Sequence, residues 1–433
     1  MPPLQLTGSA DQTAIIQDGA ARSVAEFQIV VDELSSRIAA LSCSRPALVT
    51  RRADVVAAAL LACARTGVDV LLARDPGVTS ESLLAELGVD GRIDDGLNVV
   101  AVPREESTRN EGNVFLCSSG TTGAPKVARH RLEALMGRIR QPSGKSPTSR
   151  WLLTYHPASF AGLQVSLTAL SSGSALIACA DNSIPALAAA ALCHEPTHIS
   201  GTPTFWRAFA AHLVGEGKSP ALRQITLGGE AVDQSTLDLL RRVFPQAGIS
   251  HIYASTEAGS LFAVKDGKAG FPATWLETGV DGVSLRVRDG MLEVLSPRAM
   301  VGYATATSAR AFTDDGWVST GDVVCLVDDR VLFSGRADNV INVGGSKVLP
   351  EEVEAVILRL PAVRDARVYG RKNPITGAIV AVDLVADATA DQETVRREAI
   401  AIAQGALEPY KVPRIVRFVD QITYNASGKK DRH

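Results

Sequence analysis

The first half of the chain alternates strand patterns with helix patterns, and this alternation limits the possible folds more than any other feature. Short apolar runs at Pro46–Thr50 and Val68–Leu72 flank a helical stretch at Ala53–Thr66. Parallel strands need a crossover between them, and a helix is the usual crossover. The alternation therefore predicts an α/β fold in which helices cover parallel sheets. Further strands are expected at Asn113–Cys117, Trp151–Tyr155, Ala175–Cys179 and Arg223–Leu227, and further helices at Val24–Leu41, Leu132–Ile139, Gly162–Leu170, Pro203–Val214 and Gln234–Val243.

The pattern changes near Trp275, after which short β-segments alternate with tight turns. Asp328–Asp329 separates two apolar runs and predicts a hairpin. After Asp338 the sequence indicates a compact unit with a helix beginning at Pro350, strands around 366–369 and 379–385, and a helix near 392–406. Because 433 residues exceed what one core usually serves, we expect two domains, residues 1–337 and residues 338–433.

Composition excludes several classes of protein. The chain carries 44 basic and 47 acidic side chains, so it lacks the basic excess of a nucleic-acid surface. Its most apolar early stretch, Val55–Ala64, is shorter than the roughly 18 residues of a membrane span and predicts a buried helix. The six cysteines are scattered without a CxxC pair, which favours a reduced protein of the cytoplasm.

The segment Val114–Lys126, VFLCSSGTTGAPK, carries the strongest chemical signal. An apolar strand runs into a loop of small and hydroxylated residues that ends in a lysine. Small residues let backbone N–H groups converge on an anion, and hydroxyls and an ammonium add further donors. The loop therefore predicts a phosphate site, although it lacks the GxxxxGK[ST] pattern of common NTPases. Its candidate ligand-binding residues are Ser118, Ser119, Gly120, Thr121, Thr122, Gly123 and Lys126.

Five segments in this order resemble the adenylate-forming superfamily, which includes acyl- and aryl-CoA synthetases, peptide-synthetase adenylation domains and firefly luciferase. They are Ser118–Lys126, Tyr253–Glu257 (YASTE), Ser319–Asp322 (STGD), Gly335–Gly345 (GRADNVINVGG) and Ser427–Lys429 (SGK). The resemblance covers nearly the whole chain. It implies an α/β fold whose large N-terminal domain has αβ layers with parallel sheets and a distorted β-barrel, followed by a small mobile α+β C-terminal domain.

The resemblance also implies ATP and Mg²⁺ as cofactors. Within YASTE, Tyr253 can stack on a purine with Ala254 beside it, Thr256 can donate to the α-phosphate, and Glu257 offers the hard oxygen that Mg²⁺ prefers. Three further segments complete the nucleotide site. Gly228, Gly229 and Glu230 are expected beside the adenine, and Asp322 and Arg336 at the ribose.

The implied mechanism also depends on the C-terminal domain, in both of its steps. Lys429 is the expected catalytic lysine, which neutralises charge as carboxylate and α-phosphate approach each other. Asp338 matches the hinge position, and rotation there brings Gly344 and Gly345 to the thiol side of the site. The expected reaction forms an acyl-adenylate and then transfers the acyl group to a thiol, for which coenzyme A is favoured.

The acid pocket is expected around His156, which follows a predicted strand and resembles the aromatic–His pair of the family. Phe160, Gly162, Thr202 and Gly228 are expected to line it. The residues after His156 lack the aspartate with which amino-acid-activating relatives bind an α-ammonium. An aryl or modest acyl acid is therefore favoured over an amino acid.

The string HEPTH at His194–His198 matches the HExxH zinc pattern but fails its structural requirement. Both histidines must share one face of a continuous helix, and Pro196 disrupts a helix interior. A helix is expected to end near His194 and a strand to begin near Thr197, so no zinc site is predicted here.

Two other functions stay open. A free-standing adenylation enzyme would load the phosphopantetheine thiol of a carrier protein acting in trans, because no carrier domain follows Lys429. A catalytically silent nucleotide-binding protein is disfavoured, because binding alone needs neither a hinge nor a mobile lysine. No nucleic-acid partner and no membrane span are expected.

Overall fold

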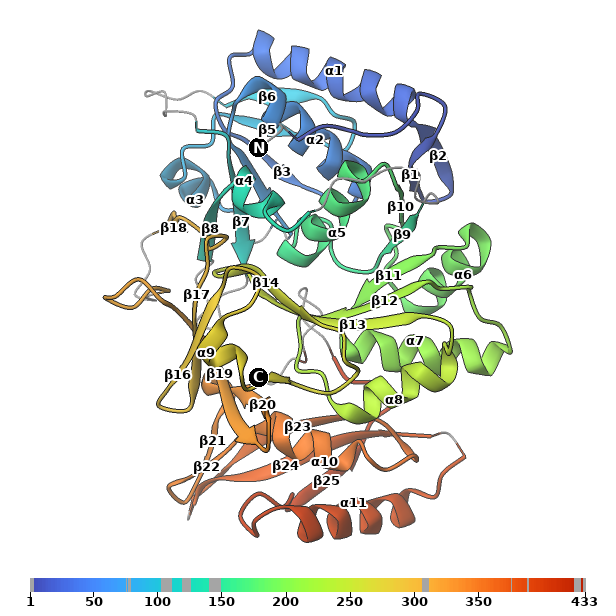
Figure 1. The fold of residues 1–433 in the computed structure, drawn as a ribbon, viewed down its shortest axis with the longest axis vertical. Helices are drawn as coiled ribbons and strands as arrows, with labels where there is room; N and C mark the ends of the chain where they lie inside the picture. Colours follow the sequence, from blue (N-terminus) through green and yellow to red (C-terminus); the bar gives the residue numbers. More distant parts are fainter. Residues whose placement is uncertain are drawn as a thin grey trace.

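The computed structural model describes residues 4–74, 76, 79–102, 111–118, 126–139, 149–305, 311–374, 376–387, 389–423 and 430, with the backbone alone at residue 118. The fold is mixed α/β, as expected, and Figure 1 shows the N-terminal elements at the top of the view and the unit formed by β21 to β25 at the bottom. No helix in this described part combines the length and apolar character needed to cross a lipid bilayer.

An eight-stranded sheet has the order β14–β13–β12–β11–β9–β10–β1–β2. Its inner strands run parallel, and β14 and β2 form antiparallel edges. The strands are β1 (Thr13–Gln17), β2 (Ala20–Ser23), β9 (Arg150–Leu153), β10 (Ala175–Ala178), β11 (His198–Gly201), β12 (Gln224–Gly228), β13 (Gly248–Ser255) and β14 (Gly259–Val264).

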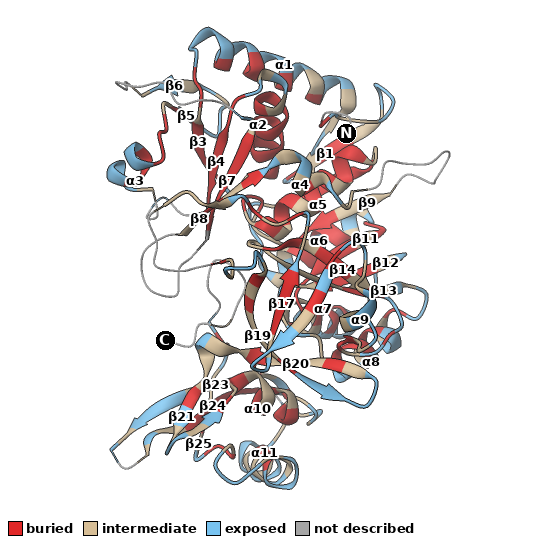
Figure 2. Cartoon of the chain, turned by 60° about the vertical axis from the view of Figure 1, so that its left-hand side comes forward, coloured by how far each residue is buried: buried red, intermediate tan, exposed pale blue. Residues whose placement is uncertain are grey.

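A seven-stranded sheet has the order β18–β8–β7–β4–β3–β5–β6, with β7, β4, β3 and β5 parallel. Its strands are β3 (Pro46–Val49), β4 (Val70–Ala73), β5 (Gly91–Ile93), β6 (Val99–Ala101), β7 (Asn113–Ser118), β8 (Lys126–Arg131) and β18 (Gly302–Tyr303). Buried side chains of both sheets join those of α2 (Ala53–Thr66) and α5 (Phe160–Ser171) in one core cluster. Burial along α2 is nearly complete, as Figure 2 shows.

Helices α6 (Ile184–His194), α7 (Pro203–Glu216) and α8 (Gln234–Val243) pack with the eight-stranded sheet in a second core cluster. Helix α6 ends at His194, where Glu195 adopts a left-handed conformation with φ 44°, and His198 opens strand β11. The two histidines of HEPTH therefore do not share a helix. The remaining helices of this region are α1 (Val24–Ala40), α3 (Glu81–Glu86) and α4 (Leu132–Met136).

A five-stranded antiparallel sheet follows, in the order β15–β20–β19–β17–β16. It curls without closing, because β15 and β16 remain its edges. Its strands are β15 (Phe271–Pro272), β16 (Ser284–Arg288), β17 (Met291–Leu295), β19 (Val318–Val327) and β20 (Arg330–Arg336). The hairpin expected at Asp328–Asp329 joins β19 to β20. Trp275–Thr278, expected within a β-rich region, forms the short helix α9.

The last sheet has the order β22–β21–β24–β23, with β25 pairing to β24. The strands are β21 (Ile341–Val343), β22 (Ser346–Val348), β23 (Val363–Asn373), β24 (Gly377–Ala386) and β25 (Ile415–Phe418), and the helices are α10 (Pro350–Ile357) and α11 (Gln392–Ala406). Their apolar side chains form a separate core cluster. Residues Ala337–Asn339, a single 3₁₀ turn called η2, connect β20 to this unit.

Candidate active site

The candidate site lies where parallel strands of the eight-stranded sheet end. Strands β9, β11, β12 and β13 are parallel neighbours, so their carboxyl ends share one edge. Ligands of open α/β sheets bind beyond this edge. The segments that leave it are His156, Thr202, Gly228–Glu230 and Tyr253–Glu257. One edge of the sheet thus collects the residues predicted at the adenine, with His156, Thr202 and Glu257.

A hydrogen-bonded chain joins this edge to the curled sheet. The hydroxyl of Tyr253 donates to Asp322, and Asp322 lies opposite Arg336 in the β19–β20 pair. The Arg336 guanidinium donates to Asp322 at 3.2 Å, to the Thr320 carbonyl at 2.7 Å and to Asp338 at 3.2 Å. The structure therefore brings together the four residues predicted for the purine, the ribose and the hinge. We call Tyr253, Asp322, Arg336 and Asp338 the ribose-side cluster.

Charges within the ribose-side cluster support one another. Burial by itself lowers the pKa of Arg336, but Asp322 and Asp338 outweigh burial, so the pKa is raised and the guanidinium stays charged. Burial and the Asp322 charge raise the pKa of Tyr253, so the phenol keeps its proton. The Tyr253 ring lies 4.8 Å from Phe333 and 5.4 Å from Phe262, measured between ring centroids. Two aromatic neighbours thus hold the ring in place.

Tyr303 contacts both Glu257 and Lys126. The Tyr303 hydroxyl donates to Glu257 at 2.9 Å, and the Lys126 ammonium lies 6.0 Å from the centre of the Tyr303 ring. Burial and the Glu257 charge raise the pKa of Tyr303, so it remains a donor. Tyr303 was missed from the sequence because it lies in a two-residue strand, β18, which is too short to show a periodicity.

Matches to two protein-family models identify the family of the chain. The model described as AMP-binding enzyme matches residues 12–302, and the model described as AMP-binding enzyme C-terminal domain matches residues 352–429. The chain is an AMP-binding enzyme. This membership confirms the adenylate-forming superfamily suggested by the five sequence segments.

The sequence relatives of this AMP-binding enzyme are adenylate-forming acid–CoA ligases. A 2-succinylbenzoate–CoA ligase of Bacillus licheniformis is 28% identical over 344 residues, which cover 75% of this chain and 70% of that protein. A 3-hydroxybenzoate–CoA ligase of Aromatoleum is 28% identical over 354 residues, covering 73% of this chain and 64% of that protein. A probable 2-succinylbenzoate–CoA ligase of Mycobacterium tuberculosis is 27% identical over 381 residues, covering 84% and 91%.

Solved structures share the fold of this AMP-binding enzyme. The anthranilate CoA ligase AuaEII in complex with anthranoyl-AMP has a TM-score of 0.80 at 17% identity, covering 97% of this chain and 93% of that chain. The o-succinylbenzoate CoA synthetase MenE of Bacillus subtilis, in complex with its acyl-adenylate intermediate, has a TM-score of 0.73 at 22% identity, covering 97% and 94%. At these identities the likeness concerns the fold alone.

Glycines and Glu230 shape the expected adenine and acid side of the AMP-binding enzyme. The Tyr155 hydroxyl donates to the Gly228 carbonyl at 3.4 Å, and Gly229 has a left-handed φ of 85° beside the Thr202 methyl group. The Glu230 carboxylate accepts from the Thr204 amide at 3.1 Å and from the Thr204 hydroxyl at 2.8 Å. Glu230 therefore fixes the start of α7 to the glycine turn.

His156 lies in a tight loop before α5. Its Nδ1 accepts from the Ala158 amide at 3.2 Å, which places the proton of the neutral ring on Nε2. Gly162 allows this loop to approach, because a side chain there would collide with the His156 carbonyl oxygen. Burial, with the charges of Arg74 and Arg51 adding to it, lowers the pKa of His156 to about 4. Phe160 lies one residue after the Ser159 cap of α5 and is buried.

Arg51 and Arg74 are functional candidates that the sequence analysis missed. They follow β3 and β4, so they leave the carboxyl ends of parallel strands of the seven-stranded sheet. Neither guanidinium forms an ion pair with a carboxylate in the described part of the chain. Burial lowers the pKa of the Arg74 guanidinium, as expected for a charge held without an ion partner. The signal available in the sequence was the place of each arginine directly after an apolar strand.

His130, on β8, is a further buried histidine, and it contacts Phe160. Its side chain is 0% exposed, and its ring centroid lies 5.7 Å from that of Phe160. Burial lowers the pKa of His130 to about 4, although the Thr256 backbone and the Glu257 charge act in the opposite direction. We call His130, His156, Arg51 and Arg74 the acyl-side group, because His130 contacts Phe160, a residue predicted to line the acid pocket, and the charges of Arg51 and Arg74 act on His156.

Several predicted residues lie outside the described part of the chain, and within it two others make no contact with the ribose-side cluster. Ser119, Gly120, Thr121, Thr122, Gly123 and Lys429 lie outside the described residues, and of Ser118 only the backbone is described, paired with Lys126. Gly344 and Gly345 form the turn between β21 and β22, held by the Thr376 carbonyl at 2.8 Å and the Asn342 side chain at 2.9 Å. Their recorded contacts lie within the C-terminal unit and do not join them to the ribose-side cluster.

The residues present fit Mg²⁺ as well as a nucleotide. Glu257 offers a carboxylate whose other contact is the Tyr303 hydroxyl. The described residues contain no cluster of three or more His, Cys, Asp or Glu side chains arranged around a metal ion. Mg²⁺ is usually bound through one or two carboxylates together with substrate phosphates. The single carboxylate of Glu257 fits this pattern, because Tyr303 contacts both Glu257 and Lys126, which ends the predicted phosphate loop.

Proposed function

We propose that this AMP-binding enzyme joins a carboxylic acid to a thiol in two steps. A carboxylate oxygen attacks the α-phosphorus of ATP, the bond to the pyrophosphate oxygen breaks, and acyl-AMP and pyrophosphate form. The thiol then loses its proton, its sulfur attacks the acyl carbon, and AMP leaves. Coenzyme A is the proposed thiol, because the sequence relatives are CoA ligases.

The observation that carries this proposal is the ribose-side cluster. Asp322, Arg336 and Tyr253 come from three strands and two sheets, yet they form one hydrogen-bonded chain. In the proposed site Asp322 accepts from the ribose hydroxyls and Arg336 holds the carboxylate in that orientation. Prepositioned groups of this kind reduce the entropy lost when the reactants are aligned.

The proposed roles around the triphosphate follow from the donors. Thr256 donates to the α-phosphate, and the loop ending at Lys126 binds the leaving phosphates. Glu257 would hold Mg²⁺, and the Tyr303 hydroxyl orients the Glu257 carboxylate. When bound, Mg²⁺ neutralises charge on the phosphate oxygens. His156, kept neutral by its surroundings, orients the carboxylate of the acid without repelling the positive groups around it.

Lys429 and Asp338 are proposed to couple the two steps. Lys429 stabilises the charge that gathers on carboxylate and α-phosphate in the first step. Rotation of residues 338–433 about Asp338 then removes Lys429 and brings Gly344 and Gly345 toward the thiol. We propose residues 1–337 and 338–433 as the two bodies of this motion, because β20 and β21 belong to different sheets.

The proposed acid is aromatic or a small to medium acyl acid. Named relatives act on 2-succinylbenzoate and 3-hydroxybenzoate, and one structural neighbour holds anthranoyl-AMP. After His156 this chain continues Pro157, Ala158, Ser159, Phe160, without an acidic residue for an amino group. The pocket therefore suits an acid without an α-ammonium.

Acid-dependent exchange of labelled pyrophosphate into ATP, over a library of carboxylic acids, tests the first step. Product analysis with CoA, and separately with carrier proteins bearing phosphopantetheine, tests the second. Exchange with thioester formation on CoA supports the proposal. Loading of a carrier alone would assign the alternative acceptor, and tight ATP binding without exchange for any acid would point to a silent nucleotide-binding protein.

Lys429→Ala separates the two steps. We expect exchange to fall by about 10²–10³-fold, as for loss of one charged group that stabilises a transition state, while thioester formation from supplied acyl-AMP is largely preserved. Lys372→Ala, at an exposed lysine of strand β23 in the C-terminal unit, serves as the control and should leave both steps unchanged. Equal loss of both steps in Lys429→Ala would refute the role given to Lys429.

A further inference from the structure

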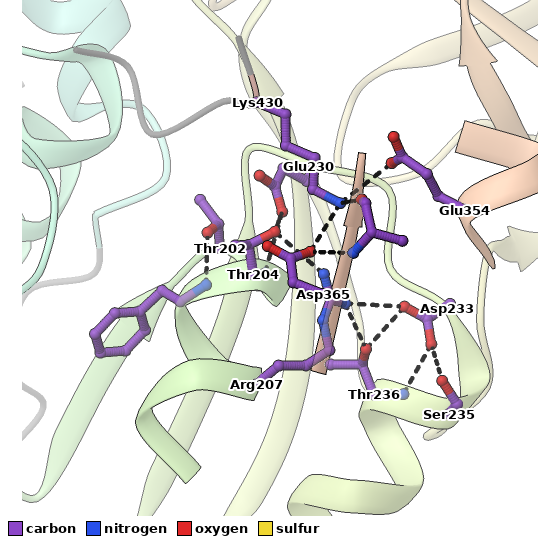
Figure 3. Close-up of polar contacts among 12 residues, drawn as sticks. Thr202, Thr204, Arg207, Glu230, Asp233, Ser235, Thr236, Glu354, Asp365 and Lys430 are labelled. Atoms are coloured by element: carbon purple, nitrogen blue, oxygen red, sulfur yellow. Dashed lines mark hydrogen bonds and ion pairs between the residues drawn. The ribbon is translucent and has the colours of Figure 1, made fainter. Parts of the chain in front are cut away.

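Lys430, the residue after the proposed catalytic lysine, is buried among polar groups of the C-terminal unit. Its side chain is only 7% exposed. The ammonium lies 3.2 Å from a Glu354 carboxylate oxygen and 3.0 Å from an Asp365 carboxylate oxygen, and it donates to the Ala366 carbonyl. Figure 3 shows the three partners converging on the ammonium.

The groups that receive Lys430 lie at the edge of the core of the unit, where Glu354 is buried and Asp365 is partly exposed. Glu354 lies on α10, with its side chain 7% exposed, and its second oxygen accepts from the Val368 amide on β23 at 2.7 Å. The Asp365 carboxylate accepts from the Ala366 amide at 2.9 Å. Val353, Ala366 and Val368 are core residues around these acids. Lys430 is therefore held by parts of the unit that have little freedom to move.

The anchor of Lys430 lies next to the nucleotide side of the N-terminal part. Strand β23, which carries Asp365, contacts helix α7, which carries Thr204 and Arg207, and Figure 3 shows Lys430 and Asp365 on the side of these residues. Glu230 and Thr204 form the junction between the glycine turn and α7. The buried contact is thus close to the edge of the sheet from which the proposed ATP site is built.

We propose that Lys430 is a positioning residue, which anchors the backbone beside Lys429 and so presents Lys429 to the reacting carboxylate and α-phosphate. This inference rests on the proposed function. Adjacent Cα atoms are about 3.8 Å apart, so an anchored Lys430 restricts where Lys429 can lie.

The anchor is compatible with rotation of the C-terminal unit. Glu354, Asp365, Ala366 and Lys430 all lie after Asp338, so their contacts travel together whatever the orientation of residues 338–433. The two adjacent lysines therefore have different tasks. Lys430 remains in the unit, while Lys429 enters and leaves the site.

Lys430→Met tests the proposal, with Lys411→Met as the matched control. Lys411 is also a largely buried lysine of this unit, with Glu352 at 2.8 Å and Glu408 at 2.9 Å. We expect Lys430→Met to slow pyrophosphate exchange by about 10–100-fold, because misplacement of a catalytic group by about 1 Å can cost about 10²-fold. Thioester formation from supplied acyl-AMP should change little. Lys411→Met should leave the ratio of the two rates unchanged.

A second variant separates positioning from stability. Lys430→Met removes a cation from the buried Glu354 carboxylate and from the partly exposed Asp365 carboxylate, and loss of one partner of a buried ion pair destabilises a fold. Lys430→Met with Asp365→Asn removes one of these charges, so its melting temperature should rise toward that of the unsubstituted protein while exchange stays slow. Recovery of exchange together with stability would show that Lys430 supports only the fold and would overturn the proposal.

The remaining outcomes are also decisive. Normal exchange in Lys430→Met would overturn the positioning role and leave the proposed function standing. Equal loss of both half-reactions would again indicate a role in stability alone. Absence of exchange in the unsubstituted protein, with every acid of the library, would overturn the proposed function and the role of Lys430 with it.

Discussion

The ribose-side cluster and the acyl-side group face the same proposed reaction but hold charge in opposite ways. In the ribose-side cluster Arg336 lies between two carboxylates, so the charges are compensated before a ligand arrives. In the acyl-side group Arg51 and Arg74 have no carboxylate ion partner within the described ranges, and His156 and His130 are held neutral. The first region is complete by itself, and the second is suited to receive an anion.

This difference separates stability from function. Removal of a charge from a compensated cluster leaves its partner buried and unpaired, which costs stability as well as binding. Removal of a buried charge that has no partner relieves a desolvation cost. The two regions should therefore respond to substitution with opposite changes in stability, although both should lose activity.

The largest effect is expected for Asp322→Asn. Arg336 loses a charged partner, and the ribose hydroxyls lose a charged acceptor, where each such hydrogen bond contributes about 1.5–3 kcal/mol. We expect kcat/KM for ATP to fall by about 10²-fold and the melting temperature to fall as well. Pyrophosphate exchange against ATP concentration measures the first quantity, and thermal unfolding measures the second.

Asp315→Asn is the control for Asp322→Asn. Asp315 pairs with Arg286 at 2.7 Å in the same part of the structure, so this variant breaks a comparable Arg–Asp contact away from the nucleotide residues. Its ATP dependence should match that of the unsubstituted protein. If both variants showed the same ATP dependence, Asp322 would have no role at the ribose.

A smaller effect with the opposite change in stability is expected for Arg74→Gln. The charge of Arg74 acts on His156, beside which the acid is proposed to bind. The KM for the acid should therefore rise by about 10-fold, near the lower end for a charged hydrogen bond, while the KM for ATP changes little. The melting temperature should stay constant or rise. A rise in the KM for ATP instead would assign Arg74 to the triphosphate.

Arg45→Gln provides the matched control for Arg74→Gln. Arg45 is another half-buried arginine of the seven-stranded sheet, but it pairs with Asp69 at 2.7 Å. Its loss should lower the melting temperature and leave both KM values unchanged. If Arg74→Gln destabilised the protein as much as Arg45→Gln, the contrast between compensated and uncompensated charge would be wrong.

Local signals predicted the elements well. Helices Ala53–Thr66, Gln234–Val243 and Gln392–Ala406 have the bounds read from the sequence, because caps and apolar spacing act within a few residues. The residues predicted for the ribose were also found together, since each lies in a recognisable segment. Trp275–Thr278 forms a helix where β-structure was expected, and its four residues are too few to show a period.

Contacts between segments distant in the sequence could not be predicted from local sequence signals. Tyr303 meets Glu257 across 46 positions, and Lys430 meets Glu354 across 76. Neither side chain lies in a periodic segment that would identify its partner. Arg74 becomes notable only because the fold places the end of β4 near His156. Topology, which decides these neighbours, is set by the whole chain rather than by any short segment.

The smallest effect is the loss of stability at low pH, which again involves the acyl-side group. The pKa values of His130 and His156 are lowered to about 4, against about 6.5 for a free histidine. Between these values the unfolded chain binds more protons than the folded protein, so stability rises with pH there and is lost as pH falls from about 6.5 to about 4. Each histidine contributes at most about 1.4 kcal/mol per pH unit.

His130→Leu should flatten the slope of unfolding free energy against pH by up to one proton, measured by urea unfolding from pH 7.5 to 4.5. At pH 7.5, where the ring is neutral in both states, the variant reports only the change in packing. An unchanged slope would mean that His130 takes up its proton without unfolding, and the acyl-side group would then tolerate further positive charge.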